Sequence, residues 1–457
     1  MLIRIGPVHR RRSGGHTAAL RTRRRVVVTL VAGGVLAFGA SAAPAEPVFT
    51  VRAPAGGGPK RYDRVPVQRF GRPAARTVLV LTPGKYSGAG EFTLVARDLV
   101  ALVPSVQIWA VDRREQGFED NTVMAAGDPG RALEYYLHGA SVDGRTFTPP
   151  PAAGVGYMGR WGLARVVADL HAVVRRAHAS GRRVVLGGYS LGASVAEAYA
   201  VWDFRGRAGA RDLAGLVLID GGLLHGVDLP SVAEARARAH ELLTAPRDDP
   251  FRRKMPWSYG VLTGVAGLLA RNAPQAPSPL NADPAVPAYL TTSFTPTNAT
   301  FLGAAASRLY PAVGPAAAYA GHPADAGDPR PWVDGALTPA ARLAAWAAQS
   351  PVDIIDWYTP QRLVNLDVVA ADRLVPSRLT RALGLRLAHL RSLSLPLYAF
   401  QTSAVPELGQ RLVNASRIRH PRLVADPRMT HIDPLVAVPE QNTFLHTVVP
   451  FLRRLSR

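Results

Sequence analysis

A serine flanked by two glycines is the residue of this chain best suited to covalent chemistry. It lies in the motif Gly188-Tyr189-Ser190-Leu191-Gly192, directly after a short apolar run. A strand that turns sharply into a helix presents a serine at the tip of the turn, and the two glycines keep that turn free of side-chain clashes. The motif therefore predicts that Ser190 is a nucleophile. The alternative is an ordinary strand-to-helix turn that contains a serine.

Apolar runs and helical periodicities alternate on both sides of this motif. The runs predict strands at residues 77–81, 106–111, 184–186, 213–220, 396–401 and 422–425. The periodicities predict helices at residues 91–103, 163–180, 193–202, 407–415 and 442–455. Because strands and helices follow each other in repeated succession, we expect an α/β fold with a mostly parallel sheet that is covered on both faces.

The pattern changes between residues 225 and 390, where helical periodicity replaces strands. Helices are expected at residues 231–243, 339–349 and 374–393, whereas residues 121–160 are expected to be irregular. We therefore expect one sheet domain with a large, mainly helical insertion. Its predicted parts are a first core segment at 46–224, the insertion at 225–390 and a second core segment at 391–457.

Charge and composition narrow the class of protein. The chain has 457 residues, 47% of them hydrophobic, and a net charge of +21. Eight arginines and no acidic residue lie within residues 1–25, which leaves +13 for the remainder. The remaining arginines are scattered and do not alternate with aromatic residues, so we expect no nucleic-acid partner, although weak association with anionic surfaces is compatible with them. The chain has no cysteine and therefore no disulfide.

The beginning of the chain has the pattern of an export signal. Arginine clusters precede an apolar run at residues 26–40, and small residues suited to signal peptidase cleavage follow near positions 42 and 45. The arginines at 23–25 also resemble a twin-arginine signal. We predict that residues 1–45 direct export to a secreted or extracytoplasmic location. The alternative is an uncleaved membrane anchor, for which the apolar run is slightly short.

Together these features resemble the α/β-hydrolase superfamily, especially its serine esterases and lipase-like members. The resemblance covers residues 76–224 and 395–455, and the inserted segment stands where that family carries its cap. It implies an α/β-hydrolase sheet flanked by helices with a helical cap. It also implies a Ser-His-acid triad in which Ser190 matches the nucleophile.

The resemblance assigns a base, which a serine hydroxyl needs before it can attack. Of the twelve histidines, His431 follows the last expected strand and precedes the final helix, where the family places its base. A loop at this point can reach over the sheet edge to Ser190. We therefore predict His431 as the base, and the alternative is a loop histidine with a local role.

The acid departs from the family pattern. The resemblance would place it just after the strand at 396–401, yet the first acidic residue there is Glu407. Some related lipases carry the acid one strand earlier, where Asp220 stands. We therefore predict Asp220 as the acid, with Glu407 as the alternative and Asp433 as a further candidate. Asp372 resembles an acid loop but precedes the expected strand.

The negative charge of a tetrahedral intermediate needs donors that already point at it. The backbone N–H of Leu191, at the start of the helix, is one candidate. The resemblance places the other donor in the loop after residues 77–81, where Pro83-Gly84 replaces the family's usual histidine and glycine. Lys85 is then the predicted second donor, followed by Tyr86, whereas the competing interpretation is a plain glycine loop.

The sequence thus predicts a secreted serine hydrolase that cleaves a small apolar ester through an acyl-enzyme. A peptide or amide hydrolase of the same fold is one alternative, and a catalytically silent binding module that lost its acid is another. The sequence contains no metal-ligand cluster and no dinucleotide-binding loop, so neither a metal nor a cofactor is expected. It does not define an oligomeric state.

Overall fold

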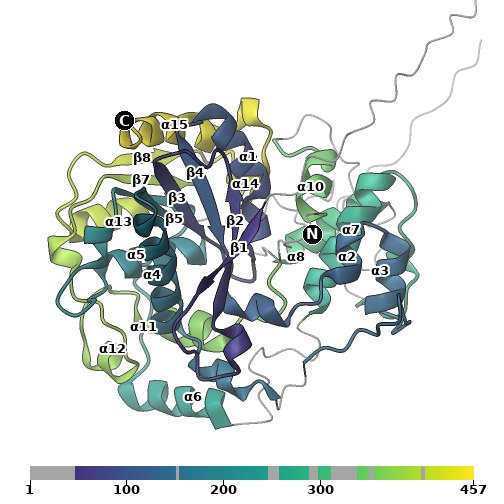
Figure 1. The fold of residues 1–457 in the computed structure, drawn as a ribbon, viewed down its shortest axis with the longest axis horizontal. Helices are drawn as coiled ribbons and strands as arrows, with labels where there is room; N and C mark the ends of the chain where they lie inside the picture. Colours follow the sequence, from purple (N-terminus) through teal and green to yellow (C-terminus); the bar gives the residue numbers. More distant parts are fainter. Residues whose placement is uncertain are drawn as a thin grey trace, which may run out of the picture. The chain divides into compact units, whose positions relative to one another are not determined.

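An eight-stranded sheet forms the centre of the fold (Figure 1). Its strands are β1 (Val48–Arg52), β2 (Arg64–Phe70), β3 (Thr77–Thr82), β4 (Val106–Val111), β5 (Arg183–Tyr189), β6 (Gly215–Ile219), β7 (Leu397–Gln401) and β8 (Arg422–Ala425). They lie in the order β1-β2-β4-β3-β5-β6-β7-β8. Only β2 runs antiparallel to its neighbours, β1 and β4. The expected α/β class with a mostly parallel sheet is confirmed.

The computed structural model describes most of the chain after its beginning. The described residues are 47–150, 154–244, 257–287, 297–309, 337–348, 355–402 and 407–457. The export signal expected at residues 1–45 lies outside them. By its internal contacts, Ala45–Arg457 forms one compact unit.

Helices cover both faces of the sheet. One apolar cluster joins alternate strand residues such as Leu79 and Leu81 to the helices α1 (Thr93–Leu102) and α15 (Thr443–Leu455). The other cluster joins Val78 and Val80 to α4 (Leu163–Ala179), α5 (Leu191–Val201) and α13 (Leu408–Ala415). Because successive side chains of a strand point to opposite faces, one sequence run supplies both clusters. The two groups of helices are seen on the two sides of the sheet in Figure 1.

The helix before the nucleophile motif illustrates how local sequence sets this packing. The buried apolar residues of α4 form one stripe, as the helical period requires: Leu163, Val167, Leu170, Val173, Val174 and Ala177. Gly181 follows with a φ of 72°, a backbone conformation that favours glycine and ends the helix. β5 then begins two residues later, so the end of α4 fixes where the strand before Ser190 starts.

Two strands at one edge of the sheet were not expected from the sequence. β1 and β2 form an antiparallel hairpin beside β4. Pro66 lies inside β2, and a proline within an apolar run argues against a strand because it cannot donate a backbone hydrogen bond. Val65 and Val67 on either side of it are nevertheless buried, so tertiary packing overrides the local signal.

The segment between β6 and β7 contains helices and no strand among its described residues. They include α6 (Val232–Thr244), α7 (Ser258–Asn272), α8 (Asn298–Leu309), α10 (Ala340–Ala347), α11 (Val368–Ala370) and α12 (Arg378–Ala382). α7 packs against α8 and α10. None of the helices in the described part of the chain combines the length and the apolarity that a membrane span needs.

Two sequence expectations about helices were wrong. The helix expected at 374–393 is reduced to α12, because Leu374 and Gly384 adopt φ values of 52° and 75°, which no helix contains. Residues 121–160, expected to be irregular, include α2 (Thr122–Ala125) and α3 (Pro129–Tyr136). Asp128 caps α3 by accepting the amides of the first turn, a start signal that is visible in the sequence.

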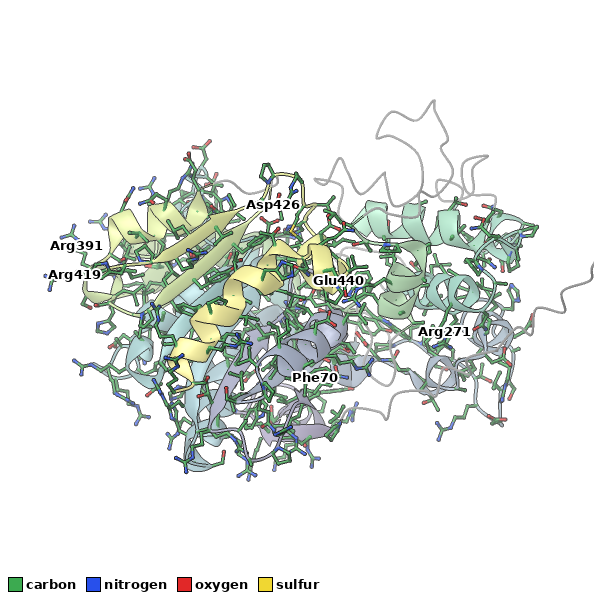
Figure 2. All side chains as sticks on the ribbon, turned by 90° about the horizontal axis from the view of Figure 1, so that it is seen from above. Phe70, Arg271, Arg391, Arg419, Asp426 and Glu440 are labelled. Atoms are coloured by element: carbon green, nitrogen blue, oxygen red, sulfur yellow. The ribbon has the colours of Figure 1, made fainter. Side chains whose placement is uncertain are left out.

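Charged side chains are distributed between the surface and the interior. Arg391 and Arg419 are exposed and extend outward from the molecule, whereas Phe70 lies within it (Figure 2). Arg113 and Arg114 are exceptions, since both are buried at the end of β4. Buried arginines require partners, and those of Arg113 lie close to the candidate site.

Candidate active site

Ser190 occupies a strained turn between β5 and α5. Its φ is 52° and its ψ is −117°, outside the conformations that residues with a Cβ normally adopt. Such strain costs about 1–3 kcal/mol and persists only where the surroundings enforce it. Its backbone N–H donates to the Ile219 carbonyl at 2.9 Å, which fastens the turn to the end of β6.

Three glycines allow the backbone segments around Ser190 to approach each other. A Cβ on Gly188 would overlap the Gly192 carbonyl, and one on Gly192 would overlap the carbonyl of Thr82 at the end of β3. A Cβ on Gly221, just after β6, would overlap the backbone of Ser190 itself. The expected reason for the two motif glycines is therefore seen directly in the packing.

His431 lies in the loop between β8 and α14 (Asp433–Val436). Its Nδ1 is 2.5 Å from Oδ2 of Asp220. Its ring packs against the ring of Tyr189 with 4.7 Å between centroids, and the Tyr189 hydroxyl donates to the His431 carbonyl at 3.0 Å. The residue immediately before Ser190 therefore positions the histidine. Because Nδ1 faces the carboxylate, Nε2 is the ring nitrogen left to accept a proton.

Asp220 follows β6 and is fully buried. Its Oδ1 accepts the Thr402 amide at 2.6 Å, and its Oδ2 accepts the Thr402 hydroxyl, also at 2.6 Å. Its own amide donates to the Phe400 carbonyl at 2.8 Å. Thr402 thus stands where the family pattern would place an acid, and it donates to an acid carried by the neighbouring strand.

The other candidate acids lie elsewhere. Glu407 is exposed at the start of α13, and the structure does not bring it to His431. Asp433 accepts the Thr430 amide at 2.6 Å and the Thr338 hydroxyl at 2.8 Å, so it holds the loop that carries the histidine. Asp372 accepts backbone amides of the segment that begins at His225.

The two predicted oxyanion donors lie at the same edge of the sheet. Leu191 is the first residue of α5, so its N–H has no acceptor within the helix. Lys85 lies in the loop that follows β3, at residues 83–87. The close approach of Gly192 to Thr82 and Pro83 packs the start of α5 against the start of this loop. The loop that contains Lys85 therefore begins beside the helix that follows Ser190.

Three buried acids lie in the region of the candidate site, and one of them binds this loop. Oε1 of Glu91 accepts the Gly84 amide at 2.8 Å, and burial raises the pKa of Glu91 to about 8. Burial also raises the pKa of Glu115 to about 8, and the nearby negative charge of Asp356 adds to the increase. Glu197 accepts the Leu223 amide at 2.5 Å, and burial raises its pKa well above the usual range. Glu91 and Glu197 thus each accept a backbone amide, one in the loop after β3 and one after β6.

Four residues that hold the candidate site in place could not be recognised from the sequence. Thr402, Glu91, Arg113 and Asp356 each contact the acid or the loop at residues 83–87. The one visible signal was a threonine at the end of a strand where an acid was expected. The others are charged residues in ordinary contexts, and only their burial identifies them.

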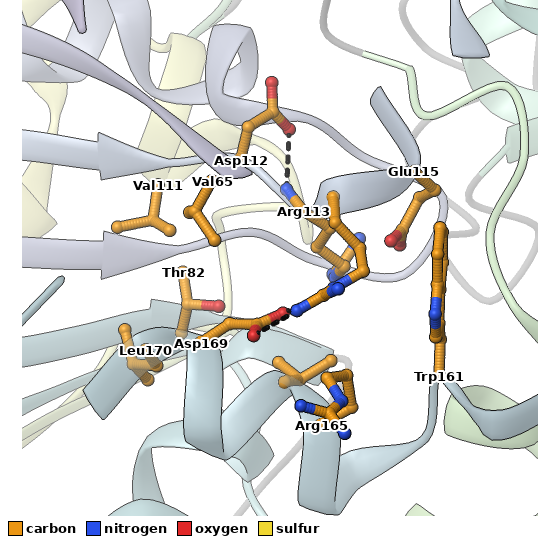
Figure 3. A pocket seen from close by; sticks show the side chains of 12 residues that line it. Val65, Thr82, Val111, Asp112, Arg113, Glu115, Trp161, Arg165, Asp169 and Leu170 are labelled. Atoms are coloured by element: carbon orange, nitrogen blue, oxygen red, sulfur yellow. Dashed lines mark hydrogen bonds and ion pairs between the residues drawn. The ribbon is translucent and has the colours of Figure 1, made fainter. Parts of the chain in front are cut away.

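A cavity lies between the ends of β3 and β4 and the first turns of α4 (Figure 3). Its lining includes Thr82, Arg113, Glu115, Trp161 and Asp169. Ser190, His431 and Asp220 do not line it. This cavity is therefore not the place where a substrate carbonyl would meet Ser190.

Comparisons with known proteins yield structures and no sequence matches. No protein-family profile and no curated protein matches the sequence. An epoxide hydrolase A from Mycobacterium thermoresistibile is 14% identical, with a TM-score of 0.42 over 89% of this chain and 98% of that one. A thermophilic esterase from Thermogutta terrifontis is 13% identical, with a TM-score of 0.36 over 90% and 100%. An epoxide hydrolase from an endophytic Streptomyces is 13% identical, with a TM-score of 0.42 over 90% and 97%.

Proposed function

We propose that this chain, which has the α/β-hydrolase fold, is a serine hydrolase that cleaves carboxylic esters through an acyl-enzyme. The observation that carries the proposal is the pairing of His431 with the buried Asp220 beside the strained turn of Ser190. A carboxylate bound to Nδ1 fixes the imidazole tautomer and stabilises the imidazolium that forms when the ring takes a proton.

The proposed reaction has two halves. His431 Nε2 removes the proton of the Ser190 hydroxyl as Oγ attacks the ester carbonyl, and the amides of Leu191 and Lys85 stabilise the resulting oxyanion. His431 then gives its proton to the leaving alcohol, and the acyl group stays on Ser190. In the second half, His431 activates a water molecule that attacks the acyl carbon, which releases the carboxylic acid and restores the serine.

The proposed substrate is a small apolar ester. The segment between β6 and β7 is rich in Ala, Leu, Trp and Tyr, a composition that suits an apolar acyl group. The segment corresponds in sequence position to the cap of the family.

We further propose that residues 1–45 direct the enzyme out of the cytoplasm, because of their arginines and apolar run.

A fluorophosphonate probe tests the nucleophile. We expect it to label the purified protein and to leave Ser190→Ala unlabelled, since the probe reacts with an activated serine hydroxyl. Ser194→Ala is the matched control. Ser194 lies in α5 and its hydroxyl donates to the Gly222 carbonyl, so labelling should persist when it is replaced. If the unaltered protein is not labelled, a binding module replaces the proposed enzyme.

A substrate panel tests the bond that is cleaved. Aryl esters of short and long acyl chains are compared with aminoacyl anilides, each at several concentrations. We expect ester hydrolysis with a clear dependence on chain length. Faster cleavage of the anilides would make the protein a peptide or amide hydrolase of the same fold.

A further inference from the structure

One buried guanidinium binds most of the carbonyl groups in the loop that contains Lys85. Nη2 of Arg113 donates to the Pro83 carbonyl at 2.7 Å and to the Gly84 carbonyl at 2.6 Å. Its Nη1 donates to the Ser87 carbonyl at 3.0 Å. Three backbone acceptors on both sides of Lys85 are thus held by a single side chain.

Glu91 holds the same loop by accepting a hydrogen bond from its backbone. Glu91 accepts the Gly84 amide, so this residue is bound through both its carbonyl and its N–H. A Cβ on Gly84 would lie about 3.0 Å from the Tyr189 ring, so the loop also packs against the residue that precedes Ser190. The loop is therefore fixed relative to the nucleophile from several directions.

The inserted segment reaches this loop as well. Ile355 forms a β-bridge with Ser87, and the Asp356 amide donates to the Tyr86 carbonyl at 3.0 Å. The Asp356 carboxylate lies 3.4 Å from Nη1 of Arg113 and accepts the Thr359 hydroxyl at 2.5 Å. Residues from the segment between β6 and β7 thus complete the set of groups around Arg113.

The chemistry of this site favours arginine over any other residue. The guanidinium is planar and presents donors in a fixed fork, which matches carbonyl groups spread along a turn. Its side chain is 4% exposed and that of Asp356 is 0% exposed, so neither charge is solvated by water. Losing the Asp356 charge would leave Arg113 with its three carbonyl acceptors, whereas losing the Arg113 guanidinium would leave Asp356 as a buried charge without a cationic partner.

We propose that Arg113 is a positioning residue for the loop at residues 83–87, and that Asp356 fixes Arg113, which connects the segment between β6 and β7 to the proposed oxyanion donor in this loop. The proposal rests on the proposed function, because it gives the Lys85 amide a role in catalysis. Arg113 would position the Lys85 amide by binding the loop carbonyls, without contacting the substrate.

The neighbouring residue provides a matched control. Arg114 is buried to a similar extent, and it binds Asp169 in a bidentate pair at 2.8 and 2.5 Å. It also contacts Asp63 at 3.0 Å and the Pro54 carbonyl at 3.1 Å, and none of these partners belongs to the loop. Arg113 and Asp169 both line the cavity of Figure 3.

Kinetics of Arg113→Lys and Arg114→Lys form the first test, with a p-nitrophenyl ester as substrate. Lysine keeps the positive charge but lacks the planar set of N–H donors of the guanidinium. For Arg113→Lys we expect kcat to fall about 10–100-fold with KM changed by less than about threefold, as for the loss of a donor that acts in the transition state. For Arg114→Lys we expect a lower thermal midpoint and a kcat within about twofold of the parent.

Hydrogen exchange of the same variants forms the second test and needs no activity. Backbone amides in peptides that cover residues 83–92 should exchange faster in Arg113→Lys and remain unchanged in Arg114→Lys. Unchanged exchange in Arg113→Lys would overturn the proposal even in an active esterase. If the protein cleaves no ester but the loop exchanges faster, the proposed function fails and the positioning of the loop stands.

Asp356→Asn covers the case in which Arg113→Lys does not fold. This variant keeps the arginine and all three loop carbonyls, and it removes only the charge that fixes the guanidinium. We expect a smaller fall in kcat than for Arg113→Lys, with faster exchange in residues 83–92. If kcat and the amide exchange rates of residues 83–92 are the same in Asp356→Asn as in the parent, the proposed role of Asp356 is wrong.

Discussion

At the scale of single residues, the acid is the most informative position. Asp220 is fully buried against His431, whereas Glu407 is exposed at the start of α13. We expect Asp220→Asn to lower kcat by about 10⁴-fold, because the imidazole would be held in the wrong tautomer. Glu407→Gln should change kcat by less than about twofold and serves as the control. Steady-state ester hydrolysis measures both, and a large loss in Glu407→Gln alone would contradict the assignment.

Thr402 is a second residue with a predicted effect. Its hydroxyl donates to the same Asp220 oxygen that faces the histidine. A hydrogen bond to a charged group contributes about 1.5–3 kcal/mol, so Thr402→Val, which keeps the shape, should lower kcat by about tenfold or more. The measurement is kcat as a function of pH. An unchanged profile would show that the amide of Thr402 alone suffices to hold Asp220.

Residues that belong to a motif or to a family pattern can be predicted from the sequence. Ser190 is predicted from its flanking glycines, and His431 and Asp220 from the resemblance to the α/β-hydrolase family; the structure brings the latter two into contact. Arg113 and Asp356 were not found, because they are 243 residues apart and each is an ordinary charged residue in its own context. Only the folded chain shows that they meet.

At the scale of elements, the turn between β5 and α5 sets a strict limit on side-chain size. A Cβ on Gly192 would overlap the backbone of Thr82, whereas a Cβ on Gly181 would meet no atom within 4 Å. We expect Gly192→Ala to cost about 3 kcal/mol or more, because backbone must move. Gly181→Ala should cost about 1 kcal/mol, from its positive φ alone.

The thermal midpoint of unfolding and the rate of fluorophosphonate labelling measure this difference. Gly192→Ala should lower both, since the nucleophile turn shifts with the helix. Gly181→Ala should lower only the midpoint. Equal changes of the midpoint and of the labelling rate in the two variants would mean that the turn between β5 and α5 tolerates the extra methyl group.

The strands show which elements the sequence specifies. β3 to β8 were expected near their observed positions, because buried parallel strands are continuous apolar runs. The hairpin of β1 and β2 was missed, since Pro66 and the charges near it hide the alternation of Val65 and Val67. The helix expected at 374–393 was wrong, because periodicity does not reveal a positive φ such as that of Leu374.

At the scale of the whole molecule, buried acids make stability depend on pH. The pKa of Glu91 is raised from 4.5 to about 8 in the folded protein. The folded state therefore holds a proton that the unfolded state releases, and this contribution is complete below pH 4.5 and lost as the pH rises towards 8. For one group the free energy of unfolding falls by about 1.4 kcal/mol per pH unit within that window.

Glu91→Gln tests this dependence, because the amide oxygen can still accept the Gly84 N–H and has no proton to lose. Between pH 5.5 and 7.5 we expect the free energy of unfolding of Glu91→Gln to fall less steeply than that of the parent. The two slopes should differ by about 1 kcal/mol per pH unit. Denaturant titrations at several pH values measure it, with the exposed Glu407→Gln as control. Parallel curves for parent and Glu91→Gln would place the titrating group elsewhere.

The distance along the chain between Asp220 and His431 also affects the timing of biosynthesis. The two residues are separated by 211 positions, and the strands β7 and β8 are made only after the helical segment between them. At about 5–20 residues per second, a ribosome needs roughly 10–40 seconds to pass from one to the other. A nascent chain thus carries Ser190 and Asp220 long before it carries His431, so the proposed triad can form only after the ribosome has passed both β7 and β8.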